Sequence, residues 1–163
     1  METPLLIADS STLLNFLFVG RFDLVQALGY RVRIVDAVYE EIQTARKELD
    51  ALIKKGELRT LSFEGAAYMS RLASLLNRGL DTGEAFTVAA AIERGAMVAM
   101  DDRRAIKKSR EESPGLVVIT SPDIIVANIK RGYLTVETAD EIKAVWGLKH
   151  RFSLKFQSFK ELI

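Results

Sequence analysis

The stretch that decides the fold is LDTGEAFTVAAAIERGAMVAMDDRRAIKKS, residues 80–109. Its first half carries apolar residues such as Val88 and Ile92 at helical spacing, and Gly95 supplies a helix stop. The apolar run AMVAM at 96–100 has the length of a strand that is buried on both faces, and two acids follow it directly. The stretch therefore predicts a helix, a buried strand and an acidic pair at the end of that strand.

Three other apolar runs of strand length occur along the chain, at residues 5–8, 32–35 and 115–119. Segments with helical spacing separate them, and the helix predicted after the second strand is expected to break near Thr44. Alternating strands and helices predict an α/β fold, with a parallel sheet that is covered by helices on both faces. Further helices are predicted at about 63–76, 123–130 and 136–145.

Composition narrows the chemistry that a site can use. The 163 residues include no cysteine and one histidine, so a metal site has to be built from oxygen ligands, which suit Mg²⁺ or Mn²⁺. The net charge of +1 does not by itself indicate a nucleic-acid or membrane partner. Because no signal-peptide pattern and no apolar run of about 18 residues is found, we expect a cytoplasmic protein without a membrane partner.

Acids follow two of the predicted strands. Asp9 ends the first strand, and Asp101 and Asp102 end the strand at 96–100. In an open parallel sheet the functional crevice lies at the carboxyl ends of the strands, so these acids are expected to lie close together.

Two helices are expected to bring further acids to the same crevice. Helix geometry places Glu41 at the border of its helix's apolar face and Glu40 away from it, which makes Glu41 the better candidate. Glu84 lies at the edge of the apolar face of the next helix, with Asp81 three residues before it. Each acid can also be explained alone as a helix cap or a surface charge, and DTGE has the spacing of a capping box.

Capping does not predict that four carboxylates share one crevice. Such carboxylates repel one another unless a cation neutralises them, so a divalent metal is the implied ligand. A carboxylate-held ion of this kind can orient a phosphate and activate a bound water. The predicted chemistry is therefore hydrolysis of a phosphodiester by a metal-activated water.

A basic segment follows the acidic pair. Arg103, Arg104, Lys107 and Lys108 lie close to the proposed metal site, and Arg104 and Lys108 share one helix face. This face is a candidate phosphate-binding surface for single-stranded RNA, although a solvated helix face explains it equally well. No aromatic stacking cluster is evident, so recognition through the RNA backbone is expected rather than a strong base code.

These segments resemble a known family. LLIADSSTLL, VYEEI, the stretch at 80–109 and GLVVITSPDIIVANIKRGYL are similar to the PIN-domain family of metal-dependent ribonucleases, which includes VapC-like toxins. The resemblance covers about residues 4–135. It implies a three-layer α/β/α fold with about five parallel strands in the order 3-2-1-4-5, and a site for one or two Mg²⁺ or Mn²⁺ ions.

The resemblance also assigns the site. The catalytic acids are Asp9, Glu41, Glu84 and Asp101; the metal ligands are Asp9, Glu84, Asp101 and Asp102; and the supporting residues are Ser10, Ser11 and Asp81. The choice between Asp101 and Asp102 as fourth acid stays open. Many family members have threonine two residues before that acid, whereas this chain has Ala99 or Met100.

The predicted function is a Mg²⁺- or Mn²⁺-dependent endoribonuclease that cleaves single-stranded RNA. The resemblance suggests that it is the toxin of a toxin–antitoxin pair, with a homodimer and an antitoxin protein as partners. One alternative is a PIN-like scaffold that binds RNA or protein without cutting. A second is an aspartate-dependent phosphatase, which is disfavoured because Ser11 occupies the position where that chemistry needs a second acid.

Two segments are predicted: a PIN-like domain at 1–145 and an extension at 146–163. In the extension Phe152, Leu154 and Phe156 alternate with polar residues, which predicts a strand or an extended arm with one apolar edge. That edge is expected to pack either on its own domain or on a second copy of the chain.

Overall fold

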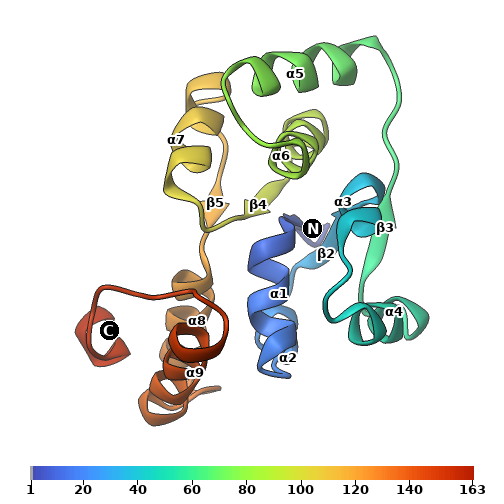
Figure 1. Ribbon diagram of the computed structural model, residues 1–163. Coiled ribbons are helices and arrows are strands. Elements are labelled where there is room, and N and C mark those ends of the chain that lie inside the picture. Colours follow the sequence, from blue (N-terminus) through green and yellow to red (C-terminus); the bar gives the residue numbers. More distant parts are fainter. Residues whose placement is uncertain (1) are drawn as a thin grey trace.

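Five parallel strands form one sheet in the computed structural model, which describes residues 2–163 (Figure 1). The strands are β1 (Leu5–Ala8), β2 (Arg31–Val35), β3 (Arg59–Leu61), β4 (Met97–Ala99) and β5 (Val118–Ile119). They lie in the order β3-β2-β1-β4-β5, and every neighbouring pair is parallel. The predicted α/β fold and the strand order implied by the family resemblance are both confirmed.

Helices cover the two faces of this sheet. They are α1 (Ser10–Phe18), α2 (Asp23–Gln26), α3 (Asp36–Glu41), α4 (Arg46–Lys54), α5 (Ala66–Asn77), α6 (Thr82–Arg94), α7 (Arg103–Glu112), α8 (Ser121–Lys130), α9 (Val136–Lys149) and the 3₁₀ helix η1 (Phe159–Leu162). Figure 1 shows α5, α6 and α7 on one side of the sheet and α1, α2, α8 and α9 on the other. The result is the predicted three-layer architecture.

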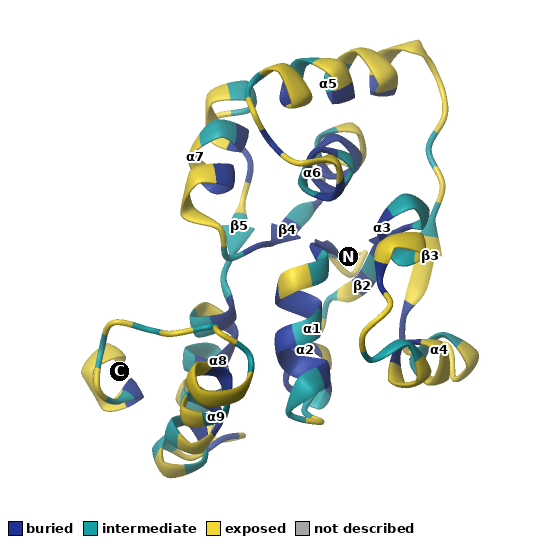
Figure 2. Ribbon diagram, viewed as in Figure 1, coloured by how far each residue is buried: buried dark blue, intermediate teal, exposed yellow. Residues whose placement is uncertain are grey.

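The centre of the core lies between α6 and strands β1 and β4. Leu6, Ile7 and Val98 are fully buried, and so are the consecutive alanines of α6 (Figure 2). Small side chains let this helix lie close to the sheet, where close packing excludes water. Since α6 also begins with the acids of DTGE, its tight packing fixes their place at the edge of the sheet.

The predicted helix break after β2 is confirmed. The α3 helix ends at Glu41, and α4 begins at Arg46 after Ala45, which adopts a left-handed conformation with φ of 58°. The Arg46 guanidinium donates to the carbonyl oxygens of Tyr39 and Ile42 over 2.7 and 2.9 Å, and so satisfies the end of α3. The break leaves Glu41 in the last turn of a short helix next to the sheet edge.

The C-terminal segment contains no strand between residues 151 and 157, so of the two predicted forms, a strand or an extended arm, the strand is wrong. The predicted alternation of half-buried and exposed side chains is present. Phe152 packs against Trp146 with ring centroids 5.3 Å apart, and Phe156 packs against Phe159 at 4.9 Å. These side chains are half-buried against the domain's own core, and the chain folds back beside α8 and α9 (Figure 1). Among residues 2–163, no helix has both the length and the apolar character that crossing a bilayer requires.

Candidate active site

The topology brings two acid-bearing strand ends together. Strands β1 and β4 are neighbours, and the helices that follow them, α1 and α7, lie on opposite faces of the sheet (Figure 1). In open α/β folds, ligands bind at the carboxyl ends of two such strands. The backbone N–H of Asp9 donates to the carbonyl of Ala99 over 2.9 Å. Asp9 and the Asp101–Asp102 pair therefore leave the same edge of the sheet.

Asp9 is a buried acid. It occupies the position before α1, but its side chain makes no capping bond to that helix, and the residue is 4% exposed. The Ser11 hydroxyl donates to Asp9 Oδ2 over 2.9 Å. Burial raises the pKa of Asp9 to about 6, with the charges of Asp81 and Asp101 adding to the rise, while the Ser11 hydroxyl and the Ser10 backbone N–H oppose it.

Glu84 and Asp81 form the capping box that the spacing suggested. The Glu84 N–H donates to Asp81 Oδ1 over 2.8 Å, and the Asp81 N–H donates to Glu84 Oε1 over 2.9 Å. The pKa of Glu84 is raised to about 7, mainly by burial and also by the nearby charges of Asp81, Asp9 and Asp102, while the Asp81 backbone N–H opposes the rise. The capping explanation is therefore confirmed, and the box anchors two acids whose charges act on Asp9 or are acted on by it.

Glu41 reaches the same place from α3. A methyl group added at Gly83, in the first turn of α6, would lie 3.0 Å from Glu41 Oε2 and 3.7 Å from Asp81 Oδ1. The absence of a side chain at Gly83 thus leaves room for both carboxylates. Glu41 itself is exposed, as an acid at the rim of a site would be.

Asp101 is held by side chains from two other helices. Its carboxylate accepts bonds from Thr12 Oγ1 at 2.7 Å, Ser121 N–H at 2.7 Å, Ser121 Oγ at 2.6 Å and Asn15 Nδ2 at 3.4 Å. These contacts supply the hydroxyl groups that Ala99 lacks. Thr12, Asn15 and Ser121 were not predicted from the sequence; the one signal for them is the polar Asn15 within the apolar run of α1.

Asp102 takes a different direction from its neighbour. Its Oδ1 accepts the Ala105 N–H over 2.8 Å and so caps α7. Asp102, Asp81 and Glu84 line a hollow of about 240 Å³, which we call the acid hollow. Asp101 instead lines a second hollow of about 520 Å³, so the two consecutive aspartates separate two cavities at one sheet edge.

The basic residues of α7 divide between these cavities. Arg104 and Lys108 line the acid hollow, in agreement with the shared face expected for them, and Arg103 lines the second hollow. Lys107 is exposed and borders neither. The guanidinium of Arg104 lies 3.2 Å from the position of a methyl group added at Gly79, which places it beside the loop that leads into α6.

Oxygen atoms are the metal-ligand chemistry that this site offers. Across residues 2–163, no lysine or arginine lies within 4 Å of the carboxylates of Asp9, Asp81, Glu84, Asp101 and Asp102. Clustered acids without cationic partners, of which Asp9 is buried, fit a hard divalent ion. In the same residues, however, no three such side chains are arranged so that they could hold an ion. Several oxygens of the cluster already accept hydrogen bonds: one oxygen each of Glu84 and Asp102 accepts a capping bond, and Asp101 accepts four bonds.

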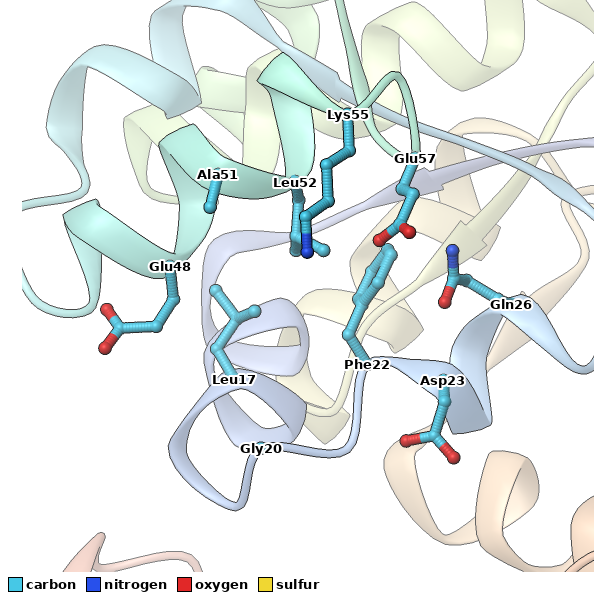
Figure 3. A pocket seen from close by; sticks show the side chains of 10 residues that line it. All are labelled: Leu17, Gly20, Phe22, Asp23, Gln26, Glu48, Ala51, Leu52, Lys55 and Glu57. Carbon is cyan, nitrogen blue, oxygen red and sulfur yellow. The ribbon is translucent and has the colours of Figure 1, made fainter.

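A third hollow lies among α1, α2 and α4. In Figure 3 the side chains of Leu17, Phe22 and Leu52 point towards one another; Leu17 belongs to α1 and Leu52 to α4. The side chains of Glu48 and Asp23 point outwards. The hollow measures about 360 Å³, and none of the predicted site residues lines it. The predicted site acids therefore lie apart from this hollow.

Comparison with known proteins identifies the class. A model of the PIN domain family matches residues 5–149, and the chain belongs to that family. PIN domains are typically nucleases and usually depend on divalent metals. No curated protein matches the chain.

Two solved archaeal structures share the fold. A PilT N-terminus domain protein, SSO1118 from Sulfolobus solfataricus P2, is 15% identical with a TM-score of 0.51, over 77% of this chain and 95% of that one. PAE2754 from Pyrobaculum aerophilum is 14% identical with a TM-score of 0.55, over 78% of this chain and 96% of that one. At these identities the likeness concerns the fold alone.

Proposed function

We propose that this protein is a Mg²⁺- or Mn²⁺-dependent endoribonuclease that hydrolyses single-stranded RNA at the acid cluster. The observation that carries the proposal is the convergence of carboxylates from the ends of β1 and β4 and from α3 and α6. Among residues 2–163, no lysine or arginine pairs with any of these carboxylates. A protein that keeps buried acids unpaired loses stability, so a bound cation is the physical reason for the arrangement.

The ion would be held by Asp9 and Glu84 together with Asp101 or Asp102. When bound, the ion would act as a Lewis acid that activates a water and stabilises charge on the phosphate. Glu84 accepts the Asp81 N–H through Oε1 alone, so its other oxygen, Oε2, is available as a ligand. Asp101 Oδ1 accepts a single bond, from the Ser121 N–H, and so keeps a lone pair for the same purpose.

Other residues of the chain position the substrate. Arg104 and Lys108 line the acid hollow, where they would bind the phosphate next to the one that is cleaved. Glu41, exposed beside the start of α6, would accept the proton of the attacking water. The homodimer and the toxin role with an antitoxin partner are further parts of the proposal, which sedimentation and co-purification would test.

The test is cleavage of a 5′-labelled single-stranded RNA with Mg²⁺, Mn²⁺ or EDTA. We expect cleavage by the wild type with either metal, and loss of cleavage in Asp9→Asn, Glu84→Gln and Glu41→Gln. Glu40→Gln is the matched control, because Glu40 is exposed on the neighbouring position of the same helix.

The products should carry no 2′,3′-cyclic phosphate, since water rather than the neighbouring 2′-hydroxyl is the nucleophile. This feature separates the activity from that of a contaminating metal-independent ribonuclease. Cleavage that survives EDTA and both the Asp9→Asn and Glu84→Gln substitutions would contradict the proposal. Metal-dependent RNA binding without cleavage would instead support the non-catalytic scaffold.

A further inference from the structure

We infer that the C-terminal segment, residues 150–157, forms a second part of the RNA site, in which a nucleotide next to the cleaved one stacks on an aromatic side chain. The inference rests on the proposed function and extends it beyond the region that matches the PIN family, which ends at residue 149. The site is the hollow of about 520 Å³ that Asp101 lines, which we call the tail groove.

The tail groove joins two regions that are distant in sequence. Asp101 and Arg103 line it from the end of β4 and the start of α7, and Phe152, Lys155 and Phe156 line it from the C-terminal segment. Its volume falls within the range of about 300–1,000 Å³ that is usual for ligand pockets. Since Asp101 borders the groove and Asp102 borders the acid hollow, a strand that passes over this pair would enter both.

The lining of the groove fits a nucleotide. Phe152 and Phe156 are half-buried, and each packs nearly perpendicular to a second ring, at 71° to Trp146 and 69° to Phe159. These contacts fix the rings while leaving part of each in the groove. Lys143 lies over the ring of Phe156, with its Nζ 5.7 Å from the centroid, so Phe152 is the better stacking surface.

Charge favours the same occupant. Arg103 and Lys155 are exposed at the groove, and neither has a carboxylate within 4 Å anywhere in residues 2–163. Asp101 is the one acid of the described chain that lines the groove, and its charge is already engaged by Thr12, Asn15 and Ser121. Two unpaired cations beside aromatic rings are the composition of single-strand binding sites.

The fold thus supplies the aromatic surface that the sequence did not reveal. Phe152 follows Asp101 by about fifty positions, and the folding back of the segment after α9 brings the two to one cavity. RNA recognition would then combine phosphate contacts at α7 with stacking at the tail.

Binding to a non-cleaving protein tests the inference directly. Fluorescence anisotropy of a labelled 12-nucleotide single-stranded RNA would be measured with full-length Asp9→Asn protein, alone and combined with Phe152→Leu or Phe156→Leu. Leucine keeps apolar packing against Trp146 and Phe159 but removes the aromatic face. We expect the Kd to rise about five- to thirty-fold for Phe152→Leu and less for Phe156→Leu, and Phe152→Tyr to retain binding.

A charge pair refines the test. Lys155→Ala should reduce the slope of log Kd against log salt by about 0.7, because one phosphate contact is lost. Lys47→Ala is the matched control, since Lys47 is an exposed lysine of α4 that borders neither hollow, and it should leave the slope unchanged. Melting temperatures close to that of the parent protein would show that the variants fold.

Unchanged RNA affinity in both phenylalanine variants would overturn the inference. If the phenylalanine variants differ from the parent protein in oligomeric state by sedimentation but bind RNA with unchanged affinity, the inference is also overturned, and the groove is assigned to a second copy of the chain. RNA binding that depends on Phe152, without any cleavage by the wild type, would overturn the proposed nuclease and keep the tail site. Cleavage and RNA affinity that do not depend on Phe152 would keep the proposed nuclease and overturn the tail site.

Discussion

Two acids of this protein, Glu112 and Asp9, occupy opposite environments. Glu112 of α7 accepts bonds from Arg78 Nε at 2.7 Å, Ser74 Oγ at 2.8 Å and Arg71 at 3.3 Å, and these bonds lower its pKa. Asp9 is more deeply buried, receives one hydroxyl bond from Ser11, and has a raised pKa of about 6.

The opposite pKa shifts show that the charge of Glu112 stabilises the fold, whereas the charge of Asp9 destabilises it. Arg71 of α5 and Arg78, which directly follows α5, pair with Glu112 and connect α5 to α7. The nearest charges that act on Asp9 are those of other acids, Asp81 and Asp101. Groups that lower stability in this way are characteristic of functional sites, where the charge is needed for a ligand.

Substitution of these two acids should give opposite results. Asp9→Asn should reduce RNA cleavage by about 10³-fold, because loss of an ion ligand removes several kcal/mol of transition-state stabilisation. Its melting temperature should stay the same or rise, since a desolvated acid among like charges is removed. Glu112→Gln should retain cleavage at a temperature where it is folded. If both variants lose activity in proportion to lost stability, the distinction fails.

The two consecutive aspartates sharpen the same comparison. Asparagine is a good helix cap, so Asp102→Asn should keep the start of α7 and the melting temperature while lowering cleavage about 10- to 100-fold. Asp101→Asn would turn an amide N–H₂ towards the Ser121 donors, so it should lower both cleavage and the free energy of unfolding, the latter by about 1–3 kcal/mol. Wild-type cleavage by Asp102→Asn would leave Asp101 as the sole fourth acid.

The raised pKa values predict how stability depends on pH without metal. Because the pKa of Asp9 rises from 3.8 to about 6 and that of Glu84 from 4.5 to about 7, the folded state binds more protons than the unfolded state between these limits. The free energy of unfolding should therefore fall as pH rises from about 4 to about 7, by about 3 kcal/mol from Asp9 and by less from the more exposed Glu84, whose charge solvent screens.

Denaturant unfolding at several pH values, with and without Mn²⁺, would measure this effect. Asp9→Asn should flatten the profile, and Mn²⁺ should stabilise the wild type more at pH 7.5 than at pH 5, because an ion favours the charged carboxylates. A wild-type profile that rises through this window and does not differ from that of Asp9→Asn would contradict the assignment.

The smallest expected effect concerns the structural acid. Glu112→Gln should lower the free energy of unfolding near pH 7 by about 1 kcal/mol, or roughly 2–4 °C in melting temperature. Its lowered pKa means that this stabilisation is present above the ordinary glutamate pKa of 4.5 and is lost as pH falls below it. Glu111→Gln is the control, as that more exposed acid contacts Arg78 at 3.5 Å. If the two substitutions lower the free energy of unfolding equally, Glu112 does not stabilise the fold more than an ordinary surface acid does.

Local signals were sufficient to predict the elements that frame the site. The β1 and β4 strands, the start and end of α6, and the break after α3 all follow from apolar runs, the DTGE cap and Gly95. The β3 strand was not predicted, because its three residues are largely exposed and pair with β2 at the edge of the sheet. Such an edge strand has no apolar run for a pattern to detect.

Contacts between distant residues explain what else the sequence did not reveal. Asp101 meets Thr12 and Ser121, which lie 89 and 20 positions away, so its orientation depends on how α1 and α8 pack. The alternation in the C-terminal segment predicted an apolar edge correctly. It could not show that Trp146 and Phe159, rather than a neighbouring strand, would pack against that edge.

The most direct test of the central claim, that the acid cluster is a divalent-metal site, is calorimetric titration of Mn²⁺ into the protein at pH 7.5. We predict that the wild type binds one or two ions with release of protons, and that Asp9→Asn does not bind at the same concentrations while Glu112→Gln binds as the wild type does. Absence of Mn²⁺ binding by the wild type, or equal binding by Asp9→Asn, would contradict the account.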